Sequence, residues 1–141
     1  MAFKGLILIE FSLAYCVPVV LLIPGFAVAP YLLVLAFMSL SYILVFLGAT
    51  LLLSGAVVGL WASIQLLCKT MDPGLIIGKP RRLLRFLVCG VASLLAVTPF
   101  VALVAPGLVI AAMLLPIPVA IHLVYLNRTY LWAIPAALEG S

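Results

Sequence analysis

The chain has 141 residues, of which 69% are hydrophobic and only 7% are charged, and its formal net charge is +4. A domain in water needs more polar surface than this, and the apolar runs are longer than a globular core requires. The composition therefore excludes a water-soluble protein and predicts an all-α integral membrane protein. The basic residues stand at the ends of apolar runs, which is typical of membrane orientation and not of nucleic-acid binding.

Four apolar runs predict four transmembrane helices, because each reaches the roughly 20 residues that a spanning helix needs. The predicted spans are residues 5–28, 31–67, 83–105 and 107–126. They use almost the whole chain, so residues 1–141 form a single transmembrane domain with one basic loop at 69–82.

Prolines mark both the shape of the spans and their joints. Pro18 and Pro24 interrupt the first span, and Pro116-Ile117-Pro118 interrupts the fourth, so kinked helices are expected. Ala29-Pro30 joins the first two spans, and Ala105-Pro106-Gly107 joins the last two. The chain is therefore expected to form two antiparallel hairpins.

The second apolar run, Tyr31 to Cys68, is unusually long. As one helix its 38 uncharged residues would measure about 57 Å, against roughly 30 Å of hydrocarbon. It forms either one long tilted helix or two short spans that break near Gly48-Ala49-Thr50. The distribution of charge favours one crossing and hence one long second helix.

With four spans, Lys4, the basic segment 69–85 and Arg128 all fall on one side of the membrane, while the opposite joints carry no charge. Positively charged connections stay on the cytoplasmic side. We therefore expect both termini in the cytoplasm, and the bacterial inner membrane as the location.

Three ionisable residues are candidates for a polar layer within the membrane. Glu10 lies about 9 Å beyond Lys4 along the first span, and Arg85 and His122 are expected at a similar depth. Buried charges are costly unless they are paired. The layer could fix helix packing, reach the interface, or form a proton, ion or headgroup site.

Small residues follow one face of the second span at Gly48, Gly55, Gly59 and Ser63. Such a stripe lets two helix backbones approach closely. It predicts close packing, either inside this chain or onto a partner helix or a second copy.

The basic loop offers Lys69, Lys79, Arg81 and Arg82. These residues set the orientation and are expected to contact anionic headgroups or an acidic soluble partner. Asn127-Arg128-Thr129 matches a glycosylation sequon but lies on the cytoplasmic side, so it is interpreted as chance.

No catalytic, metal or nucleotide motif is apparent, and no cofactor is expected beyond bound lipid. Cys16, Cys68 and Cys89 have no metal-binding spacing and are interpreted as buried free thiols.

Three classes of function remain. The first is a non-catalytic subunit, assembly or anchoring partner of a larger membrane complex, bound to another membrane protein or to itself. The second is a small oligomeric transporter or channel. The third, with least support, is a lipid-modifying membrane enzyme.

Overall fold

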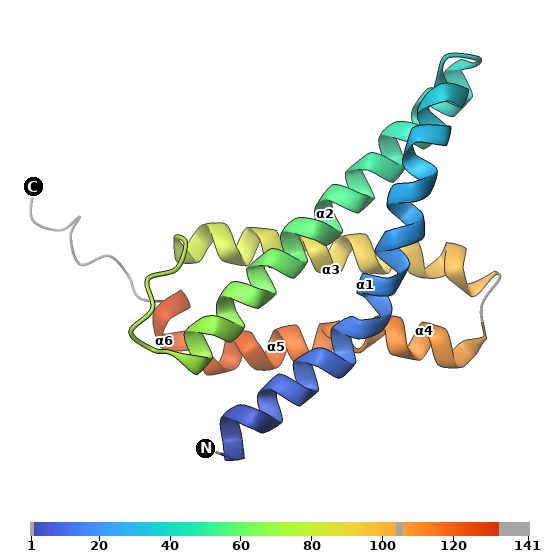
Figure 1. The fold of residues 1–141 in the computed structure, drawn as a ribbon. Coiled ribbons are helices and arrows are strands. Elements are labelled where there is room, and N and C mark those ends of the chain that lie inside the picture. The colour runs from blue at the N-terminus through green and yellow to red at the C-terminus, as the bar shows by residue number, and fades with distance from the viewer. Residues whose placement is uncertain (1, 104–105, 133–141) are drawn as a thin grey trace, which may run out of the picture.

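The computed structural model describes residues 2–103 and 106–132, and these are 88% helical with no strand. The helices are α1 (Ala2–Ala36), α2 (Leu40–Met71), α3 (Pro80–Ala102), α4 (Gly107–Leu114), α5 (Pro116–Leu126) and α6 (Arg128–Leu131) (Figure 1). Four segments are long and apolar enough to cross a membrane: most of α1, then α2, α3, and α4 with α5 taken together. The all-helical architecture with four candidate spans is therefore confirmed.

The joint between the first two spans was predicted at Ala29-Pro30, and this position is wrong. α1 continues through Pro18, Pro24 and Pro30 to Ala36, and the chain turns at residues 37–39. Each proline removes one backbone donor, whereas ending a helix exposes several unpaired backbone groups, which is costly in apolar surroundings. The turn falls where a cap is available, because the Ser39 hydroxyl accepts a hydrogen bond from the Ser41 N–H at the start of α2.

The part of the long second run that follows the turn lies in α2, which has no break at Gly48-Ala49-Thr50. The Thr50 hydroxyl donates to the Phe46 carbonyl at 2.8 Å, so its polar group is satisfied by its own helix. α2 has 32 residues and is long, as predicted, and α1 is also long, with 35 residues.

The second pair of spans differs from the prediction only in detail. α3 begins at Pro80 instead of residue 83, because proline is preorganised for the first helical position and Arg81 and Arg82 extend the helix. Its predicted end at residue 105 lies outside the described residues. The fourth span breaks between α4 and α5 at Leu115, directly before Pro116 and Pro118, which both lack a backbone donor.

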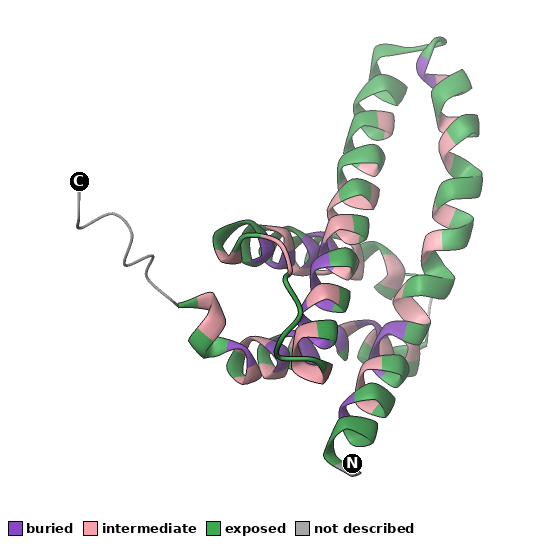
Figure 2. Cartoon of the chain, turned by 60° about the vertical axis from the view of Figure 1, so that its left-hand side comes forward, coloured by how far each residue is buried: buried purple, intermediate pink, exposed green. Residues whose placement is uncertain are grey.

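α3 runs alongside the α4–α5 pair, and the α1–α2 hairpin crosses both obliquely (Figure 1). The main core lies where the hairpin crosses them, near the start of α1 and the end of α2 (Figure 2). Its most completely buried members include Ile7 from α1, Leu66 from α2, Leu83 from α3 and Leu123 from α5. We call this region the base.

The outer part of the hairpin, residues 26–52, differs from the base. In Figures 1 and 2 its far end stands away from α3, α4 and α5, with α1 and α2 paired to each other. Only Ala36 is buried in this stretch, and none of its residues is charged. Phe37 and Met38 at the tip are among the most exposed apolar side chains. We call residues 26–52 the hairpin arm.

Candidate functional site

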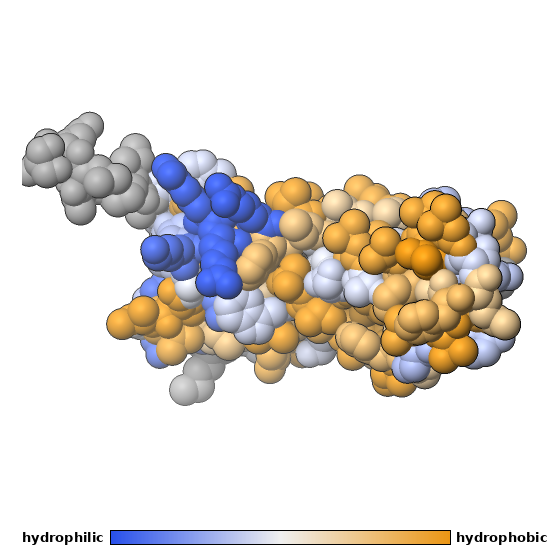
Figure 3. Space-filling view, turned by 90° about the horizontal axis from the view of Figure 1, so that it is seen from above, coloured by the Kyte–Doolittle hydropathy of each residue, from blue (hydrophilic) through white to orange (hydrophobic). Residues whose placement is uncertain are grey.

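The basic residues lie toward the base, at the opposite end of the hairpin from its tip, and Figure 3 shows strongly hydrophilic side chains gathered at one end of the visible face. The Lys4 ammonium donates to the Met71 carbonyl at 2.5 Å, so the start of α1 is tied to the end of α2. The base therefore combines the core, the charges and most of the polar ties between helices.

Glu10 and His122 form a pair between α1 and α5. The His122 Nδ1 lies 3.1 and 3.0 Å from the two carboxylate oxygens of Glu10. The pair lies on the surface of the bundle, because 37% of the Glu10 side chain and 39% of the His122 side chain are exposed. Arg85, the third residue of the predicted layer, is exposed on α3 and makes no ion pair or hydrogen bond with any residue that the structure describes.

A second polar contact joins α1 to α2 beside the core. The Tyr15 and Ser63 hydroxyl oxygens are 2.6 Å apart, and the Ser63 hydroxyl lies 2.9 Å from the Gly59 carbonyl. Because Ser63 has a single hydroxyl proton and donates it to Gly59, Tyr15 donates to Ser63. Phe11 stacks on the Tyr15 ring at 4.4 Å between centroids. Sequence reasoning missed the role of Tyr15, since a lone tyrosine in an apolar run has no distinctive signal.

The small-residue stripe packs against α3 of the same chain. A Cβ added at Gly59 would lie 2.4 Å from the Cα of Gly90, so the two backbones are in contact there. One added at Gly55 would clash with the Ser93 hydroxyl. At Gly48 an added Cβ would meet no atom within 4 Å, so no other helix approaches this member of the stripe closely. The geometry is that of helix packing inside the chain, which was one of the two alternatives for the stripe.

The loop between α2 and α3 is held by side chains from its surroundings. The Lys69 ammonium donates to the carbonyls of Pro73 and Leu75, at 2.6 and 2.8 Å. The Tyr130 hydroxyl donates to the Gly78 carbonyl at 2.5 Å, and desolvation raises the pKa of this phenol above its ordinary value. Lys69 is therefore engaged in shaping the loop and is not a free basic group.

The other predicted basic contacts remain available. Lys79, Arg81 and Arg82 are exposed at the start of α3, and none forms an ion pair with a described residue. The Arg82 guanidinium lies 5.2 Å from the centre of the Phe86 ring. These three side chains form an exposed cationic patch.

Asn127 was given no role in the sequence analysis, where its glycosylation sequon was interpreted as chance, but it connects two helices. Its side chain is buried, and its amide nitrogen lies 3.2 Å from the Leu66 carbonyl, 2.8 Å from the Thr70 hydroxyl and 2.9 Å from the Leu123 carbonyl. It therefore ties the end of α5 to the end of α2. The sequence does indicate such a role, because Asn127 follows an apolar run and an asparagine amide can donate hydrogen bonds to the unpaired carbonyls at a helix end.

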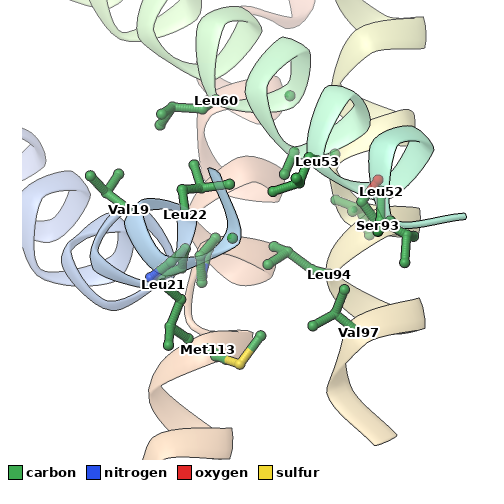
Figure 4. Close-up of a pocket in the computed structure, with 18 of the residues that line it drawn as sticks. Val19, Leu21, Leu22, Leu52, Leu53, Leu60, Ser93, Leu94, Val97 and Met113 are labelled. Carbon is green, nitrogen blue, oxygen red and sulfur yellow. The ribbon is translucent and has the colours of Figure 1, made fainter. Parts of the chain in front are cut away.

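A cleft of about 710 Å³ lies between α1, α2 and α3 and reaches to α4 and α5 (Figure 4). Leucine and valine side chains from three helices point into it, including Leu22, Leu53 and Leu94. Pro18, Pro24 and four glycines also contribute to its wall, so part of the wall is backbone. The cleft extends from Tyr15 in the base to Leu32 in the hairpin arm.

The described residues contain no cluster of three or more His, Cys, Asp or Glu side chains that could hold a metal ion. Cys16, Cys68 and Cys89 are exposed and free, so the prediction that they are buried is wrong. Sulfur is weakly polar, and an outward-facing thiol at the surface of an apolar helix needs no special partner. The arrangement thus offers helix packing, one titratable pair, a cationic patch and an apolar cleft.

No known protein family, curated protein or solved structure matches the chain.

Proposed function

We propose that the protein is a non-catalytic integral membrane subunit that assembles with, or anchors, a larger membrane complex. In this proposal the four apolar segments cross a bacterial inner membrane, with the base and both termini on the cytoplasmic side. Support comes from the charge distribution, because the basic residues flank the base while the turn at 37–39 has no charge. The exposed Lys79, Arg81 and Arg82 would then face anionic lipid headgroups.

The observation that carries the proposal is the hairpin arm. At about 1.5 Å per residue, α1 and α2 measure roughly 50 Å, whereas α3 measures roughly 35 Å. The arm therefore extends past the helices that cover the base, and its apolar side chains have few neighbours in this chain. Large contiguous apolar surfaces mark sites of membrane or protein contact. The arm is the surface that we assign to the partner.

The first test is the native mass of the gently solubilised protein, taken from its own host with everything that co-purifies. A photo-cross-linking residue at Val34 or Leu44 in the arm then identifies what lies against it. Ile121 on α5 is the matched control, because its exposed fraction of 65% is close to the 63% and 67% of the two arm positions. A larger protein cross-linked from the arm but not from Ile121 supports the proposal.

A small oligomeric transporter is the second candidate, and the Glu10–His122 pair is the observation that favours it. Ionisable residues within membrane-spanning segments commonly mark the pathway of an ion or a proton, and here two of them contact each other. A pure homo-oligomer in the mass measurement would favour this candidate. Substrate uptake that Glu10→Gln abolishes, with assembly intact, would then replace the subunit proposal.

A further inference from the structure

The proposed function assigns no role to the apolar cleft between α1, α2 and α3. Its volume of about 710 Å³ falls within the range of roughly 300–1,000 Å³ that is typical of small-molecule sites. The cleft is therefore large enough for a narrow, flexible molecule.

The lining defines the chemistry of the occupant. The few polar groups at the wall are already bonded: the Ser93 hydroxyl donates to the Cys89 carbonyl at 2.9 Å, and the Tyr15 hydroxyl donates to Ser63. Apolar cavities exclude water, because water finds no hydrogen-bond partners there. An occupant that needs no polar contact over its buried length fits these walls.

We infer that the cleft binds an acyl chain of a membrane phospholipid. In a bilayer, acyl chains surround the helices at high concentration, and an unfilled cleft would lose the dispersion contacts of its lining. A chain that leaves the bilayer for the cleft gains no hydrophobic free energy, so binding depends on close packing against fixed walls. The backbone surfaces at Pro18, Pro24 and the wall glycines provide such walls.

The inference depends on insertion of the helices in a bilayer but not on a protein partner. Val34 and Leu44, which are assigned to the partner, do not line the cleft. The hairpin arm also contributes Leu32 and Gly48 to the cleft wall, so the two surfaces adjoin, and Val97 on α3 reports on the cleft alone.

Gly48 provides a direct way to fill the cleft. It lines the cleft, and a Cβ added there meets nothing within 4 Å. Gly48→Phe therefore adds a large side chain at the cleft wall, on a Cβ that clashes with nothing. Gly5→Phe is the matched control, because Gly5 is also an open helical glycine but lies on α1 outside the cleft.

The experiment reconstitutes the protein into vesicles of phosphatidylethanolamine and phosphatidylglycerol, with a trace of phosphatidylcholine that carries a diazirine at the end of one acyl chain. After irradiation, mass spectrometry compares labelling at Leu52 and Val97 in the cleft with labelling at Leu44 and Ile121 outside it. We expect the wild type to be labelled in the cleft. We expect Gly48→Phe to reduce that labelling at least fivefold without changing the outer sites, and Gly5→Phe to change neither.

Labelling at the outer sites also shows that each variant has inserted and folded. If Gly48→Phe does not insert, Gly48→Leu fills less of the cleft and should give a smaller, graded loss. Absence of cleft labelling in the wild type would overturn the inference, as would equal labelling in the two phenylalanine variants. A stoichiometric polyisoprenoid retained from the host, or a polypeptide cross-linked from Val97, would also overturn it by naming another occupant.

Discussion

The base and the hairpin arm are built from the same two apolar helices, yet they are stabilised differently. In the base, α1 and α2 pack against α3 and α5 and are tied to their neighbours by Lys4, Tyr15 and Asn127. In the arm, the side-chain hydrogen bonds that the structure describes stay within one helix or its cap, as at Thr50 and Ser39. Hydropathy alone does not separate the two regions.

The difference shows what determines which helices pack together in a chain this apolar. Helices in lipid have no hydrophobic driving force toward one another, so close backbone contact and hydrogen bonds decide which of them pack. The base has both, at Gly59 against Gly90 and at Tyr15 with Ser63. The arm has neither toward the rest of the chain, which leaves its surface available for lipid or a partner.

The contrast predicts opposite results for one substitution at two glycines of the same helix. Gly59→Leu should destabilise the fold by about 3 kcal/mol, because its Cβ would overlap the Gly90 backbone, which cannot move aside as a side chain could. The thermal unfolding midpoint of the detergent-solubilised protein measures this effect. Gly48→Leu is the control and should be neutral or slightly stabilising, since its Cβ meets open space and leucine favours helix. Equal losses at the two sites would refute the distinction between base and arm.

Asn127→Ala should cost about 2 kcal/mol, since it removes a buried amide that serves acceptors on α2 and α5. Thr129→Ala, two residues further on at an exposed position, should change the free energy of unfolding by less than about 0.5 kcal/mol. Both values are obtained by titrating the protein with a denaturing detergent. A neutral Asn127→Ala would mean that the tie between α2 and α5 contributes nothing to the fold.

Much of the architecture is predictable from the chain, because span number depends on long apolar runs. The unbroken course of α2 past Gly48 is predictable as well, since no charge interrupts the chain between Leu40 and Cys68. The first joint is not, because proline usually ends a helix in water but costs only one hydrogen bond within an apolar helix. The Ser39 hydroxyl caps α2 directly after the turn, and a single serine of this kind is a weak signal in a sequence.

The sequence predicted which residues belong to the candidate polar layer, but not which of them are in contact. Depth along the helices suggests Glu10, Arg85 and His122 as one layer, but depth does not determine which face of a helix a residue occupies. The structure brings Glu10 and His122 together and leaves Arg85 apart. The cleft has no sequence signature at all, because its lining residues come from five helices and resemble the rest of the spans.

Tyr15→Phe should cost about 1 kcal/mol, a typical net value for one buried hydrogen bond. A double-mutant cycle with Ser63→Ala isolates the contact, and the coupling should approach the cost of the single change. Ser54→Ala is the matched change toward the arm, where the hydroxyl donates only to the Leu51 carbonyl of its own helix. It should have almost no effect, so a comparable loss at Ser54 would contradict the proposed difference.

Glu10→Gln should have the smallest effect on the isolated protein, below about 1 kcal/mol, because the pair is more than a third exposed. Both carboxylate oxygens approach a single nitrogen of His122, so the change removes a charge while glutamine keeps an acceptor. A double-mutant cycle with His122→Gln measures the coupling, first in detergent and then in the complex purified from the host. If a partner or a second copy covers the pair, the coupling should grow in the complex, because a hydrogen bond is electrostatically stronger where water and headgroups are excluded. A coupling that stays the same would place this face of α1 and α5 outside the interface and leave the hairpin arm as the surface for assembly.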